Sequence, residues 1–248
     1  MDTPDPINTS NNAHPSIRNV DAGRGVEWLV GGFRLFAKAP GPWLLAGLAL
    51  LAGSAILHSI WFGSALATAY GIIFTGAMMR ACHALEQGRA FTDGLKEAIS
   101  SPHLLVLGAI AAGLGFALML VVGVMGLGAV GVGMFSPRAV GGLIGLGMLV
   151  MLVIVIAMGA ALWLAPALVV LKGVNPVDAI RLSLTATLRN VGPYLVFALL
   201  AMLACLLGAL PMGLGLLVVL PVLMCSYYLA YKDLFIGADA GEAVGYTP

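Results

Sequence analysis

The sequence predicts an all-α fold, a polytopic bundle of transmembrane helices. Four stretches contain no Asp, Glu, Lys or Arg, and they cover residues 43–79, 104–137, 139–171 and 191–231. An apolar run of about 18 residues or more predicts a membrane span, because in hydrocarbon only a helix satisfies its own backbone amides. Composition agrees: 60% of the residues are hydrophobic and 9% are charged, against roughly 25% charged in a soluble domain.

Helix length divides these stretches into six spans, since about 20 residues cover the hydrocarbon thickness. Trp43 and Trp61 bracket the first span at the level that indole rings prefer. Turns are expected near Gly63, in the glycine-rich segment 127–141 and around Pro211. The six expected spans cover residues 43–61, 65–81, 104–126, 142–165, 194–210 and 214–231. Four full spans, with the first and last runs re-entrant, is the alternative arrangement.

Two prolines are expected to distort these spans. Pro166 should kink or break the fourth span and leave residues 167–171 near the membrane interface. Pro221 should bend the sixth.

The charged residues gather on one side of the predicted membrane. With the N-terminus inside, eleven of the twelve basic residues and all eleven acidic residues fall in cytoplasmic segments, and only Arg138 falls outside. Basic residues in short loops favour the cytoplasmic side, so both termini are expected there. Residues 1–23 are expected to be a disordered cytoplasmic tail, residues 24–235 the transmembrane domain, and residues 236–248 a cytoplasmic C-terminal tail.

A repeated layout organises the cytoplasmic segments: an amphipathic helix, then a proline, then a hairpin of two spans. The expected apolar faces are Val26, Leu29, Val30, Phe33 and Phe36 in the first helix, Leu95, Ala98 and Ile99 in the second, and Val177, Ile180, Leu184 and Leu188 in the third. Spacings of three and four residues are typical of one helical face. Mixed charges beside apolar anchors favour helices that lie in the membrane interface.

The charges on these segments suggest two roles. They can simply anchor the hairpins, or they can form a platform that binds a partner protein or anionic lipid headgroups. The candidate contact residues are Arg34, Lys38, Lys96, Arg181 and Arg189. The net charge of +1 does not indicate a nucleic-acid partner.

Few residues in the predicted spans have side chains that could transfer protons or bind a metal. His58 is a lone histidine near the outer end of the first span, and Met78, Met79, Cys82 and His83 bring soft ligand atoms to the inner end of the second. We expect core packing and interfacial hydrogen bonds for them rather than a proton relay or a metal site. The sequence has no nucleotide-binding loop, catalytic triad or HExxH motif, so no catalytic residues, metal or cofactor are predicted. Small-residue spacings such as Gly141-x3-Gly145 favour close packing and leave a homo-oligomer open.

Several distinct short motifs lie within residues 24–235. They are Gly25-Val26-Glu27-Trp28 with Gly32-Phe33-Arg34-Leu35-Phe36, Ala165-Pro166-Ala167-Leu168-Val169-Val170, Asn175-Pro176 with Asp178-Ala179, Arg189-Asn190 with Pro193, and Leu210-Pro211 with Tyr231-Lys232-Asp233. With these motifs the chain resembles uncharacterised six-span inner-membrane proteins of proteobacteria. Its third repeat is distantly similar to the membrane domain of glycerophosphoryl diester phosphodiesterases. The resemblance implies a bacterial inner membrane location and no assigned activity, because the metal-binding catalytic domain of those phosphodiesterases has no counterpart here.

Two functions follow as expectations. The first is a non-catalytic scaffold or accessory to envelope or lipid processes, in contact with the bilayer and with anionic headgroups or another membrane protein. The alternative is a transporter or channel for a small neutral or apolar solute. That alternative predicts a polar cavity lined by Ser54, His58, Thr68, Tyr70 and Thr75.

Overall fold

The computed structural model describes residues 16–60, 63–135 and 137–237, and within these ranges the regular structure is entirely helical. The helices are α1 (Arg24–Ala37), α2 (Pro40–His58), α3 (Gly63–Glu86), α4 (Phe91–Ile99), α5 (Pro102–Phe135), α6 (Pro137–Leu162), α7 (Ala165–Lys172), α8 (Pro176–Arg189), α9 (Val191–Ala209) and α10 (Leu216–Phe235). The all-α prediction is therefore confirmed. The predicted terminal tails lie largely outside the described residues.

Six segments are long and apolar enough to cross a membrane. They are Pro40–His58, Gly63–Glu86, Pro102–Val130, Ile144–Lys172, Val191–Ala209 and Leu216–Phe235. These are the six segments that the sequence predicts, with boundaries shifted by a few residues at most ends. The protein is a multi-pass membrane protein by the length and composition of its helices.

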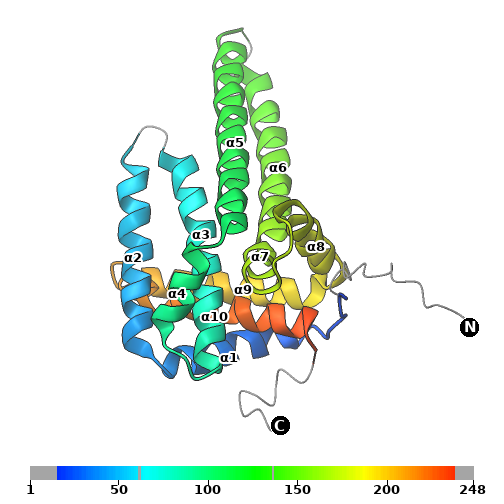
Figure 1. Cartoon of the computed structure of the whole chain (residues 1–248). Helices are drawn as coiled ribbons and strands as arrows, with labels where there is room; N and C mark the ends of the chain where they lie inside the picture. Colours follow the sequence, from blue (N-terminus) through cyan, green and yellow to red (C-terminus); the bar gives the residue numbers. More distant parts are fainter. Residues whose placement is uncertain (1–15, 61–62, 136, 238–248) are drawn as a thin grey trace, which may run out of the picture.

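Each long helix packs against its neighbour in sequence: α2 against α3, α5 against α6, and α9 against α10. The three pairs do not all run in the same direction. Figure 1 shows α5 and α6 projecting beyond the rest of the molecule, while α9 and α10 run across their direction, next to α1. Hydropathy sets how long each helix is, but side-chain packing between pairs sets these relative directions.

The predicted glycine-rich turn at residues 127–141 is wrong for most of its length. Helix α5 continues to Phe135 and α6 begins at Pro137. Each glycine weakens a helix in water by about 1 kcal/mol relative to alanine. In an apolar medium this preference matters less, because a non-helical backbone would leave its amides without partners.

The predicted break near Pro166 occurs slightly earlier, between Leu162 and Ala165. Ser183 from α8 bonds to backbone groups whose helical hydrogen bonds are interrupted at this break. Its hydroxyl donates to the Ala160 carbonyl at 2.9 Å and accepts from the Leu164 N–H at 3.0 Å. Pro166 then lies in the first turn of α7, where a missing N–H costs little. Most of α7, from Ala165 to Val170, is buried in the core of the protein. The expected position of residues 167–171 near the membrane interface stays a prediction.

The last pair of helices follows the prediction closely. A turn with left-handed φ at Met212 and Gly213 separates α9 from α10. Pro221 lies inside α10 and cannot donate a hydrogen bond to Leu217, four residues earlier. Gly47 of α2 packs at this point, since a Cβ atom on it would lie 2.8 Å from the Leu217 carbonyl oxygen.

The three short helices α1, α4 and α8 dock through small residues together with part of their predicted apolar faces, such as Phe36, Ala98 and Ile180. In α1, a Cβ on Gly32 would lie 2.7 Å from the Val222 carbonyl oxygen of α10. In α4, Gly94 makes the corresponding close approach to the Arg80 carbonyl of α3. The buried face of α8 carries Ala179, Ser183 and Ala186. Other members of the predicted apolar faces are exposed: Val26, Val30, Phe33, Ile99, Val177 and Leu188.

Candidate functional site

A buried polar cluster joins the ends of α3 and α10. Lys232 donates to both carboxylate oxygens of Glu86, at 2.9 and 3.0 Å, and the two side chains are only 9% and 11% exposed. The Tyr228 hydroxyl donates to the same carboxylate at 2.6 Å. This is the most enclosed ion pair of the described residues, and its carboxylate receives three hydrogen bonds. A buried pair persists in this way only when its remaining polar atoms are satisfied.

His83 and Gln87 extend the cluster along α3. His83 Nδ1 lies 3.1 Å from the Tyr228 hydroxyl oxygen, and Gln87 Nε2 lies 2.9 Å from His83 Nε2. The Tyr228 proton is engaged with Glu86, so Nδ1 carries the imidazole proton and Nε2 accepts from Gln87. The arrangement fits a neutral imidazole in one tautomer, held from both sides.

A second ion pair links α10 to α1. Arg24 Nε donates to Asp233 Oδ2 at 2.7 Å, and the Trp28 indole N–H donates to the same oxygen at 2.9 Å. The Asp233 side chain is 8% exposed, and Arg24 also pairs with Glu27 one turn along α1. Both charged residues of α10 are thus buried and paired, whereas the sequence suggested an ordinary charged cytoplasmic end.

The soft-ligand residues of α3 lie in the packed core or next to the buried ion pair. Met78, Met79 and Cys82 are buried in the core, and His83 is occupied by Tyr228 and Gln87. Among the residues that the structure describes, no group of three or more His, Cys, Asp or Glu side chains could hold a metal ion. In the structure these residues pack and hydrogen-bond within the fold.

The predicted contact residues Arg34, Lys38, Lys96, Arg181 and Arg189 all have exposed side chains. They lie on or directly after the three short helices, and the fold does not gather them into a single pocket.

The α3–α4 connection adds a surface ion-pair group. Glu97 of α4 contacts both Arg89 and Arg80. The hydrogen bond from the Arg89 guanidinium holds the pKa of the Glu97 carboxyl below its usual value.

The polar residues predicted to line a transport cavity do not converge. His58 Nδ1 lies 2.7 Å from the Ser54 carbonyl oxygen, and Thr68 donates to the Ser64 carbonyl. The Tyr70 hydroxyl donates to the Ala49 carbonyl, and Thr75 donates to the Gly71 carbonyl. Their polar atoms are largely used by nearby main chain, and Tyr70 and Thr75 line two different crevices. The shared polar cavity stays a prediction.

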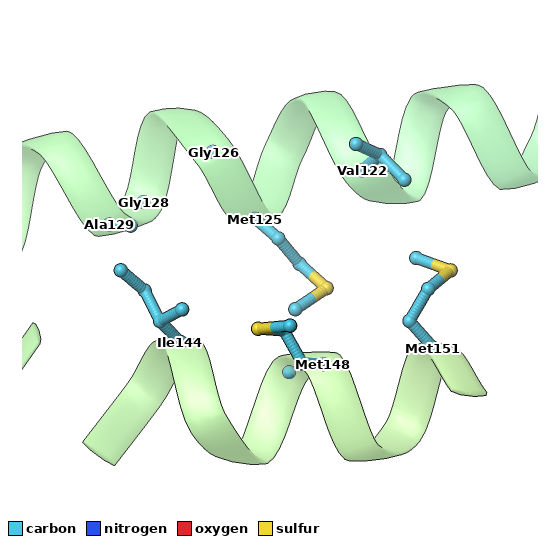
Figure 2. A pocket seen from close by; sticks show the side chains of 9 residues that line it. Val122, Met125, Gly126, Gly128, Ala129, Ile144, Met148 and Met151 are labelled. Carbon is cyan, nitrogen blue, oxygen red and sulfur yellow. The ribbon is translucent and has the colours of Figure 1, made fainter. Parts of the chain in front are cut away.

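Apolar cavities occur between the helices instead. One of about 730 Å³ lies among α2, α3 and α4 and includes Tyr70, Phe74 and Phe91 in its lining. Another, of about 520 Å³, separates α5 from α6. Figure 2 shows the side chains of Met125, Met148 and Met151 reaching into the space between these two helices. Its walls consist largely of flexible methionine side chains and glycine backbone, which can pack against apolar molecules such as lipid chains.

Comparisons with known proteins do not assign the chain to a family. No protein-family model, no curated protein and no solved structure matches the chain. The fold and its six apolar helices therefore define the class, a multi-pass α-helical membrane protein.

Proposed function

We propose that the protein is a non-catalytic scaffold of a bacterial inner membrane whose cytoplasmic face binds anionic lipid headgroups. One observation carries the proposal: α1, α4 and α8 each combine an exposed apolar side chain with an exposed cation. Phe33 accompanies Arg34, Ile99 accompanies Lys96, and Leu188 accompanies Arg189. Helices of this kind lie in the membrane interface, with apolar groups inserted and basic groups at the phosphates. The resemblance to inner-membrane proteins supports the location.

Removing the surface cations is expected to lower the preference for anionic lipid. Each basic residue near a negatively charged membrane surface contributes roughly 1 kcal/mol, so four such losses should reduce the preference by on the order of 100-fold or more. The test replaces Arg34, Lys38, Arg181 and Arg189 together by Gln. Mass spectrometry then measures the ratio of anionic to zwitterionic phospholipid that remains with the protein after extraction from mixed-lipid vesicles.

The matched control is Arg138→Gln, which removes the basic residue predicted on the opposite side of the membrane. It should leave the lipid ratio unchanged. If the quadruple variant retains the ratio of the natural protein, headgroup binding by these cations is refuted.

The orientation has its own test. The proposal places both termini in the cytoplasm and the α5–α6 connection outside, because basic residues are held on the inner side. Alkaline phosphatase, which is active only outside the cytoplasm, should be inactive when fused after Pro248 and active when inserted next to Arg138. The reverse pattern would overturn the arrangement.

A further inference from the structure

A crevice of about 380 Å³ lies among α3, α6, α9 and α10, apart from the charged cluster and the exposed cations. Its walls are mostly apolar and strongly aromatic. The lining includes Ile72, Leu162, Trp163, Tyr194, Phe197 and Tyr227. This size falls in the range of small-molecule sites, which are roughly 300–1,000 Å³.

Closely packed aromatic rings form one wall of this crevice. Trp163 lies at its centre, with ring centroids 5.0 Å from Tyr194, 5.9 Å from Phe197 and 6.1 Å from Tyr227. On its other side Trp163 packs against Trp28, whose indole N–H is tied to Asp233. Contacts of this kind hold large rings in fixed positions. A ligand would therefore meet a preformed surface and would not have to order it.

Two hydroxyl groups of the lining have no hydrogen-bond partner in the described part of the chain, those of Tyr194 and Tyr227. Other tyrosines differ in this respect, since Tyr70 donates to a carbonyl and Tyr228 to Glu86. A tyrosine hydroxyl away from water normally finds an acceptor. These two phenols can therefore donate to a ligand that brings acceptor oxygens.

The neighbouring surface points to the source of that ligand. Tyr194 lies in the first turn of α9, and Leu195 and Leu199 of the same helix are 52% and 61% exposed. The crevice is open rather than enclosed, and it borders this apolar face. At Gly159 of α6 the space remains free, because a Cβ there would meet only the Tyr194 hydroxyl, at 3.8 Å. A molecule dissolved in the bilayer can reach the site directly.

We propose that the crevice binds a glycerophospholipid. An acyl chain lies along the apolar walls formed by residues such as Ile72 and Leu162. The ester carbonyl oxygens accept hydrogen bonds from Tyr194 and Tyr227. The first turn of α9 comes shortly after Arg189, which is predicted to lie on the cytoplasmic side. Tyr194 in this turn would then lie just below the headgroups, at the depth of the glycerol esters. This site does not depend on the surface cations, since none of the residues that line it is charged.

Native mass spectrometry of the full chain, extracted from phosphatidylethanolamine and phosphatidylglycerol vesicles in mild detergent, tests the proposal. The natural chain should retain one phospholipid in addition to any held by the surface cations. Tyr194→Phe combined with Tyr227→Phe keeps both rings and removes both hydroxyls. Loss of two ordinary hydrogen bonds should weaken retention on the order of tenfold. Gly159→Leu should abolish it by filling the crevice. Tyr70→Phe, which removes a hydroxyl bonded to main chain, is the matched control and should retain lipid like the natural protein.

Thermal unfolding of each variant shows whether it is folded, and the isosteric tyrosine pair preserves the test if Gly159→Leu does not fold. The proposal is overturned if the natural chain retains no phospholipid, or if the tyrosine pair retains as much as the natural chain. Because no charge changes, a loss here is distinguishable from a loss of headgroup binding by the cations.

Discussion

Lys232→Met is expected to destabilise the protein by about 3 kcal/mol, because it leaves the Glu86 carboxylate buried without its cation. Glu86 would keep only the hydrogen bond from Tyr228, and its side chain is just 11% exposed. Methionine fills much of the lysine volume, so little of the loss would come from an empty cavity. The expected result follows from the desolvation of one unpaired charge.

The measurement is the free energy of unfolding in detergent, taken from denaturant titration of helicity. The double variant Glu86→Gln with Lys232→Met removes both charges and should recover most of the loss, since a neutral pair has no uncompensated charge. Arg181→Gln is the control. Its partner Asp178 lies 3.9 Å away and both side chains are well exposed, so the change should be below about 1 kcal/mol.

Equal losses in the single and double variants would contradict this account. They would mean that packing around the Lys232 stem, rather than its charge, stabilises the contact of α10 with α3.

Gly32→Val is expected to cost about 3 kcal/mol or more and to separate α1 from α10. The first side-chain atom alone would lie 2.1 Å from Ser226 Oγ, 2.7 Å from the Val222 carbonyl oxygen and 2.8 Å from the Ser226 amide nitrogen. Two of these neighbours are backbone atoms of α10, so no side-chain rotation can relieve the clash. The short helix must move, and the contact of Trp28 with Asp233 moves with it.

Thermal unfolding and the accessibility of Cys225 to a membrane-permeant thiol reagent measure this effect, because Cys225 is buried in the natural protein. Gly31→Ala is the matched control one residue earlier. Its added atom would meet only the flexible end of Leu229, which can turn away. A Gly32 variant as stable as the Gly31 variant would show that α1 is not held by this close approach.

The candidate site was less predictable than the helices that carry it. The two ion pairs of α10 connect residues far apart in sequence: Lys232 is 146 residues from Glu86, and Asp233 is 209 residues from Arg24. Locally, a Lys-Asp pair that ends an apolar run is typical of a solvated membrane boundary. In the sequence the Lys-Asp pair directly follows Tyr231. Only the structure shows that the Tyr231 ring is buried.

The composition and spacing of the residues determined the class of protein, the number of apolar helices and the short helices between them. These properties depend on residues that are neighbours in sequence. The length of a stretch without charged residues limits a span. Asn175 caps α8 by accepting a hydrogen bond from the Val177 N–H. Only the tertiary structure decided which face of each short helix is buried and how the pairs cross. The reason is steric and cooperative, since glycines such as Gly32 permit close backbone approach only where another helix supplies the matching surface.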